Sequence, residues 1–173
     1  MIQPVGQILQ VAYVVQDLDA ALARWIKHMN AGPFFVLEHF QAMDTTYRGQ
    51  PTDPDISIAL GFSGGVCVEF IYQHDDGPSV YRDVHGRDGE GFHHWGVATD
   101  TFDDDVARYR DMGHELAFTG RVAVGDRFAY MDTVAELGGM IELIEWTPKV
   151  ADLFGNMAAA ARDWDGSDPI RRP

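Results

Sequence analysis

The stretch QVAYV at residues 10–14 recurs in related form as HWGVA at residues 94–98, which reveals an internal repeat. Both stretches are short and apolar, as expected of β-strands. Each is followed at the same distance by an amphipathic pattern, at about residues 18–29 and 102–112, which predicts a helix. The chain therefore repeats one structural unit.

The later parts of the two units match as well. VCVEFI at residues 66–71 resembles GMIELI at residues 139–144. The first unit is longer, and its extra residues fall in 41–55, whose Thr, Asp and Pro content predicts a loop. The remaining strands are expected near 34–40, 56–61 and 66–73, and near 115–119, 126–132 and 139–146.

This pattern predicts an α+β protein built from two βαβββ modules, at about 7–74 and 92–146. The two modules make one domain, 1–146. The Asp- and Gly-rich stretch 75–91 links them. Residues 147–173 are expected to form a C-terminal tail with a short helix.

Composition and charge argue against some classes of binding partner and indicate the expected location. The 173 residues carry a net charge of −14 and show no basic stripe, which argues against nucleic acid and an anionic membrane surface as partners. The single cysteine, Cys67, lies in an apolar run and is expected to be a buried thiol. The first residues lack the pattern of a signal peptide, so the expected location is the cytoplasm.

Four polar side chains interrupt the expected apolar strands at equivalent points of the repeat. Gln10 and His94 open the first strand of each module, and Glu69 and Glu142 lie within the last. Strand alternation places each glutamate on the opposite face from its neighbours. Taken singly, each is most simply an exposed glutamate or a hydrogen-bonded histidine. If the modules pair about a pseudo-twofold axis, however, all four converge and offer ligands for a divalent metal (Zn, Ni, Co, Mn or Fe).

These strands resemble the vicinal oxygen chelate superfamily, which includes glyoxalase I, methylmalonyl-CoA epimerase, extradiol dioxygenases and bleomycin-resistance proteins. The resemblance implies a curved mixed β-sheet barrel around a metal site held by Gln10, Glu69, His94 and Glu142. The order Gln, Glu, His, Glu is similar to one form of glyoxalase I. The epimerase pattern has His first and Gln second, and its additional acid/base glutamate has no counterpart between Asp44 and Gln50.

The resemblance further implies a metal-dependent isomerase or lyase of the glyoxalase or epimerase type. It would abstract a proton next to a metal-bound carbonyl of a small substrate, with Glu142 as base and Glu69 on the opposite face. A homodimer is expected from the resemblance alone. The alternatives are a non-catalytic binding or drug-sequestering protein of the bleomycin-resistance type and, more remotely, an extradiol-type dioxygenase.

Four further side chains are candidates for substrate binding. Tyr47 and Arg48 lie in the expected loop, and Arg127 and Tyr130 lie on a strand of the second module. An arginine suits a carboxylate or phosphate group, although a solvated surface charge explains each arginine equally well. His93 precedes His94 and is expected to point to the other face, in a supporting or structural role.

Overall fold

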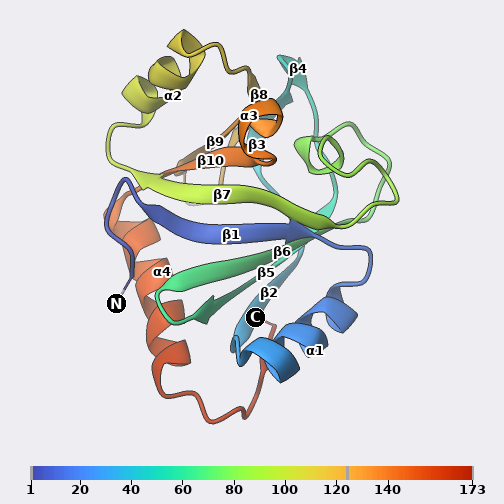
Figure 1. Cartoon of the computed structure of the whole chain (residues 1–173), viewed down its shortest axis with the longest axis vertical. Coiled ribbons are helices and arrows are strands. Elements are labelled where there is room, and N and C mark those ends of the chain that lie inside the picture. Colours follow the sequence, from blue (N-terminus) through green and yellow to red (C-terminus); the bar gives the residue numbers. More distant parts are fainter. Residues whose placement is uncertain (1, 124, 173) are drawn as a thin grey trace.

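The computed structural model describes residues 2–123 and 125–172, and one curved sheet of eleven strands organises them (Figure 1). The strand order is β11-β2-β5-β6-β1-β7-β10-β9-β8-β3-β4. The strands are β1 (Ile8–Val14), β2 (Phe34–Phe40), β3 (Met43–Tyr47), β4 (Gln50–Pro51), β5 (Ile56–Ser63), β6 (Val66–Gln73), β7 (Gly91–Thr99), β8 (Leu116–Arg121), β9 (Arg127–Met131), β10 (Met140–Glu145) and β11 (Ile170–Arg171). The helices are α1 (Leu18–Met29), α2 (Phe102–Asp111), α3 (Val134–Leu137), α4 (Pro148–Arg162) and the 3-10 turn η1 (Val80–Arg82).

The two modules are arranged symmetrically about the centre of the sheet. In the first, β1 is parallel to β6, and in the second, β7 is parallel to β10. The modules join where β1 and β7 pair antiparallel. The predicted α+β class and curved sheet are confirmed, but the sheet stays open, as a cup rather than a closed barrel.

The two faces of the sheet bury different sets of residues. The outer face packs against α1 through Val68 and Phe70, and against α2 through Ile141 and Leu143. The concave face carries the largest apolar cluster, and α4 packs there through Phe154. Period-two alternation thus turns every second residue of β6 and β10 into the cup.

The stretch 41–55 is not the loop that its composition predicts. It contains β3 and β4, and β3 pairs with β8 of the second module. Thr45, Thr46 and Tyr47 favour extended backbone, and the free edge of β8 supplies the hydrogen bonds. The first module therefore completes the sheet of the second. β7 likewise begins earlier than expected, at Gly91, so that His94 lies inside the strand.

The C-terminal tail is fixed to the first module. α4 begins after Thr147, whose side chain accepts a hydrogen bond from the Val150 backbone. The Trp164 ring lies against Gly32, and β11 pairs with β2. Among the described residues, no helix combines the length and apolarity needed to cross a membrane.

Candidate functional site

The central four strands bring the polar residues of the repeat to one point in the cup. Ala12 pairs with Glu69 across β1 and β6, and Gly96 pairs with Glu142 across β7 and β10. Gln10 lies opposite Gly96 across the module boundary. A Cβ atom at Gly96 would lie 2.8 Å from the Cβ of Gln10, so the close approach of β1 and β7 here requires glycine.

Two β-bulges turn the first-strand residues inward. The β1–β7 register skips one residue at Leu9 and one at His93, which are equivalent positions of the repeat. A bulge leaves one residue unpaired and redirects its side chain. Leu9 and Gln10 therefore both belong to the concave side, as do His93 and His94. The expectation that His93 points away from His94 is wrong for this reason.

The side chains of the four predicted residues meet in the cup, where Gln10 and His94 each approach both glutamates. Gln10 Nε2 donates to Glu69 Oε2 at 2.8 Å and lies 3.4 Å from Glu142 Oε2. His94 Nε2 lies 3.2 Å from Glu142 Oε2 and 3.4 Å from Glu69 Oε2. All four side chains are buried. We call these four residues the acidic cluster.

His93 fixes the orientation and tautomer of His94. Its Nε2 lies 3.0 Å from the Val80 carbonyl, and its Nδ1 lies 3.0 Å from Nδ1 of His94. Burial, together with the neighbouring His94, lowers the pKa of His93 to about 3, so the ring is neutral. With its own proton on Nε2 for Val80, His93 accepts at Nδ1 a hydrogen bond from His94 Nδ1. The remaining His94 nitrogen, Nε2, then points its lone pair toward Glu69 and Glu142.

The electrostatics of the acidic cluster favour a cation. Burial, reinforced by the charge of Glu142, raises the pKa of Glu69 well above its usual range. Both effects penalise the ionised form, and a cation between the carboxylates would relieve both. Burial, and then the charges of Glu69 and Glu142, raise the pKa of the Cys67 thiol. Cys67 is therefore an unreactive buried thiol.

The donor set fits a divalent transition metal. Oxygen and nitrogen atoms of Glu69, His94 and Glu142 all lie within 4.8 Å of one another, a little wider than the ~4 Å maximum between atoms bound to one such ion. Gln10 would present its carbonyl oxygen after half a turn of its amide, which exchanges Oε1 for Nε2. Two carboxylates, one imidazole and one amide oxygen suit Zn, Ni, Co, Mn or Fe.

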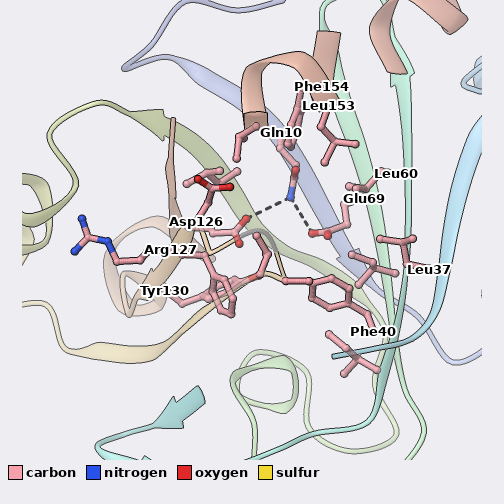
Figure 2. Close-up of a pocket in the computed structure, with 18 of the residues that line it drawn as sticks. Gln10, Leu37, Phe40, Leu60, Glu69, Asp126, Arg127, Tyr130, Leu153 and Phe154 are labelled. Atoms are coloured by element: carbon pink, nitrogen blue, oxygen red, sulfur yellow. Dashed lines mark hydrogen bonds between the residues drawn. The ribbon is translucent and has the colours of Figure 1, made fainter. Parts of the chain in front are cut away.

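A cavity of about 340 Å³ opens from the acidic cluster (Figure 2). Gln10, Glu69 and Glu142 form one part of its wall. The rest is mostly apolar and includes four residues of α4, of which three are apolar. These walls exclude water around most of a bound molecule and leave few polar contacts to orient it. The apolar lining comprises Leu37, Phe40, Ile56, Ile58, Leu60, Val122, Ala123, Phe128, Ile144, Val150, Leu153 and Phe154.

Tyr130 and Arg127, two of the predicted substrate-binding residues, also line this cavity. The Tyr130 ring stands nearly perpendicular to that of His94, with centroids 4.9 Å apart. Burial, and then the charge of Glu142, raise the Tyr130 pKa well above its usual value, so the hydroxyl keeps its proton as a donor. The Arg127 guanidinium is bound by Glu145 and Asp103, at 2.7 Å each.

Tyr47 and Arg48 are not among the residues that line the cavity. The Tyr47 hydroxyl donates to Asp83 at 2.7 Å. Arg48 forms ion pairs with Asp83 and Asp132, at 2.8 Å each, and with Glu115. These contacts tie β3 to the linker and to the second module. The Tyr47 hydroxyl and the Arg48 charge are therefore already paired within the protein, which leaves them little capacity to bind a substrate.

Two further residues line the cavity, and sequence patterns gave no sign of one of them, Asp126. The other, Tyr81, belongs to η1 in the linker, a loop position from which a side chain could reach a pocket. Asp126 precedes β9 and is 8% exposed, and its Oδ2 has no hydrogen-bond partner among the described residues. A buried carboxylate oxygen without a partner is unusual in a folded protein.

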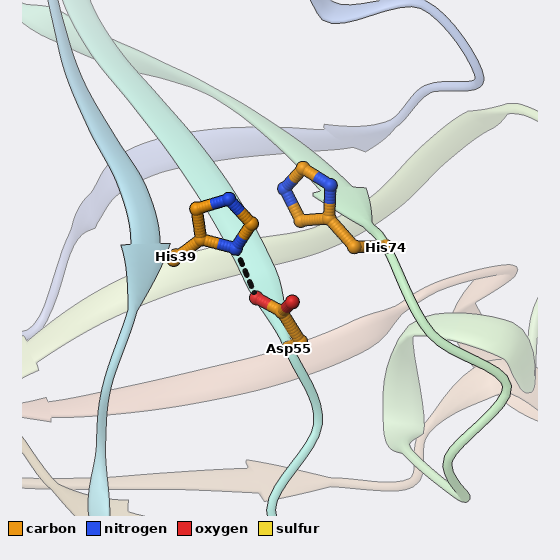
Figure 3. Close-up of side chains that lie close together, drawn as sticks. All are labelled: His39, Asp55 and His74. Carbon is orange, nitrogen blue, oxygen red and sulfur yellow. Dashed lines mark hydrogen bonds and ion pairs between the residues drawn. The ribbon is translucent and has the colours of Figure 1, made fainter.

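A second group of potential ligands, His39, Asp55 and His74, lies on the surface of the first module (Figure 3). His39 Nδ1 lies 2.7 Å from Asp55 Oδ1, and His74 Nε2 lies 2.7 Å from Ser57 Oγ. The two imidazoles stack with planes 25° apart. Imidazole lone pairs lie in the ring plane, so nearly parallel rings do not aim at one cation. The group is a hydrogen-bonded surface cluster.

The duplicated βαβββ sheet with a polar cluster at the bottom of its cup defines the class of protein. Residues 9–130 match the family described as the Glyoxalase/Bleomycin resistance protein/Dioxygenase superfamily. The chain therefore belongs to this superfamily, the one that the strand motifs resemble. No curated protein sequence matches the chain.

Solved structures share the fold. Methylmalonyl-CoA epimerase from Mycobacterium tuberculosis is 23% identical with a TM-score of 0.56, over 83% of this chain and 89% of that one. A Streptomyces coelicolor methylmalonyl-CoA epimerase variant in complex with 2-nitronate-propionyl-CoA is 20% identical with a TM-score of 0.51, over 84% and 97%. A hypothetical protein from Bacillus halodurans C-125 is 15% identical with a TM-score of 0.57, over 82% and 94%. At these identities the likeness establishes the fold.

Proposed function

We propose that this protein is a metal-dependent isomerase or lyase that moves a proton next to a carbonyl group of a small substrate. The observation that carries the proposal is the convergence of Gln10, Glu69, His94 and Glu142 beside an apolar cavity. A divalent cation held by these residues would polarise a carbonyl and stabilise the negative charge that develops on its oxygen.

Glu142 is the proposed base. Its carboxylate lines the cavity and would accept the proton from the carbon next to the carbonyl, while the electron pair of the C–H bond moves toward the carbonyl oxygen. Tyr130 lines the cavity and its hydroxyl keeps its proton, so its proposed role is to donate a hydrogen bond to a polar group of the substrate.

Glu69 is the proposed partner on the opposite side. It comes from the other module, so a substrate bound between the two glutamates meets one carboxyl group on each side. Return of the proton to the same carbon gives epimerisation, and delivery to the adjacent carbon gives isomerisation. The structures similar to this chain include methylmalonyl-CoA epimerases, and epimerisation is one outcome of this proton transfer.

The test of the base is solvent exchange. Wild-type protein loaded in turn with Zn, Ni, Co, Mn or Fe is incubated in deuterated water with a panel of thioesters and hemithioacetals, and deuterium at the carbon next to the carbonyl is measured. Glu142→Gln should lower the exchange rate at least ~100-fold. Unchanged exchange in this variant rules out Glu142 as the base.

A binding protein is the second candidate, and the apolar lining of the cavity favours it. Such a protein would hold a hydrophobic molecule without turning it over. Proton transfer requires the acidic cluster, whereas binding of an apolar molecule does not. Binding of an apolar ligand should survive His94→Ala, whereas proton exchange should not.

A further inference from the structure

We propose that Asp126 is a specificity residue, which selects substrates carrying a hydrogen-bond donor, a hydroxyl or an ammonium group, at the end of the cavity remote from the acidic cluster. The inference rests on the proposed function only in assuming that the cavity receives the substrate. It adds a second contact between protein and substrate. At this contact the protein accepts a hydrogen bond, whereas at the acidic cluster a cation would attract the carbonyl oxygen of the substrate.

The strand register places Asp126 far from the proposed base. Tyr130 pairs with Glu142 and Phe128 pairs with Ile144, and all four line the cavity. Asp126 lies two residues before Phe128, so the same alternation places it on the cavity side. At ~3.3 Å per residue it lies ~13 Å along the sheet from the level of Glu142. A substrate that reaches both needs an elongated apolar body, which the lining accommodates.

The protein holds this carboxylate in place but does not satisfy it. The backbone of Asp126 is fixed by the turn before β9, where Val122 N donates to the Asp126 carbonyl at 2.9 Å. Figure 2 draws its side chain among those lining the cavity, beside Arg127. The guanidinium of Arg127 is bound by Glu145 and Asp103, and Lys149, another cation of the lining, is exposed. Within the described residues, the Asp126 carboxylate forms no ion pair.

Selection follows from the hydrogen bond that this oxygen lacks. Oδ2 of Asp126 is buried from solvent and has no hydrogen-bond partner among the described residues. A wholly apolar ligand leaves the carboxylate unpaired, whereas a ligand with a donor supplies a hydrogen bond to it. Sites with buried polar groups reject analogues that lack the matching group more strongly than apolar pockets reject an extra methylene. Asp126 therefore discriminates against purely aliphatic and anionic ends.

The test compares two ligands of nearly the same shape, n-nonanol and methyl nonyl ether, which differ in the hydroxyl donor. Titration calorimetry is done on chelator-treated protein, so the result does not depend on any cation or on Glu142 as base. Wild type should bind the alcohol at least ~10-fold more tightly, as expected for a hydrogen bond to a charged acceptor. Asp126→Leu should bind the two ligands equally, and Asp126→Asn should show a smaller preference than wild type.

Glu142→Gln is the matched control for the orientation of the alcohol. A preference that survives Glu142→Gln and disappears in Asp126→Leu supports the proposal. The reverse pattern places the hydroxyl at the acidic cluster and overturns it, as does equal binding of both ligands, or of neither, to wild type. If Asp126→Leu fails to fold, a smaller preference in Asp126→Asn than in wild type supports the proposal, and an unchanged preference overturns it. Loss of deuterium exchange would test the proposed base and leaves this result unaffected.

Discussion

Nδ1 of His93 lies 3.0 Å from Nδ1 of His94, although the two residues are neighbours on strand β7. Regular alternation would separate their side chains to opposite faces. The bulge at His93 brings both rings into the cup. There the Val80 carbonyl contacts the His93 ring, and the His94 ring forms part of the acidic cluster. His93 thereby holds the proposed metal ligand His94 in its competent tautomer without being a ligand itself.

This relationship predicts that His93→Phe weakens metal binding ~10–100-fold, although no ligand is removed. The measurement is competition for Zn or Ni against a chromophoric chelator. His93→Gln should recover part of the affinity, because its amide both donates to Val80 and accepts from His94 Nδ1. Wild-type affinity in a folded His93→Phe variant would show that the contact has no such role.

Metal content should depend on the acidic cluster and not on the surface histidines. Wild-type protein dialysed after incubation with Zn should retain about one ion per chain by mass spectrometry. His94→Ala should retain almost none, because the cluster loses its nitrogen ligand. His39→Ala is the control, since it removes an exposed imidazole of the other cluster. Loss of metal in His39→Ala but not in His94→Ala would place the ion on the wrong surface for this proposal.

The pH dependence of stability should report the buried Glu69. Its folded pKa is raised, so the folded state binds this proton more tightly than the unfolded state. Stability that is present below the ordinary glutamate pKa of about 4.3 is then lost as the pH rises through the raised value. Glu69→Gln has no such titration. In chelator-treated protein, this variant should gain stability over wild type with rising pH.

The measurement is urea unfolding of both proteins at about pH 5.5 and about pH 8. We expect the advantage of Glu69→Gln to grow by at least ~1 kcal/mol across this range, since one pKa unit corresponds to ~1.4 kcal/mol. Saturating Zn should reverse the order, because the ion stabilises the ionised carboxylates of wild type. A difference that stays constant with pH contradicts the assignment of the raised pKa to Glu69.

Packing of α4 on the cup should contribute strongly to stability. Phe154 is buried, with its ring 5.6 Å from that of Trp146 and 6.4 Å from that of Phe62. Phe154→Ala should lower the free energy of unfolding by ~3–5 kcal/mol. The neighbouring Leu153 is 52% exposed, and Leu153→Ala should cost about 1 kcal/mol or less. Equal effects of the two substitutions in urea unfolding would mean that α4 does not pack as described.

The sequence by itself determined the repeat and therefore the duplicated sheet. Apolar alternation around Glu69 and Glu142 places each glutamate on the opposite face of its strand from its immediate neighbours, because the period of two is a local property of a strand. The equivalence of Gln10 and His94 followed from the same repeat.

The remaining features arise only in the folded protein, because they depend on partners distant in the chain. The bulge that turns His93 inward arises from the register between β1 and β7, and the pairing of β3 with β8 joins segments of different modules. The charges of Arg48 and Arg127 are matched by carboxylates that no local pattern points to. The exposure of Asp126 to a cavity likewise depends on the curvature of the whole sheet and the position of α4.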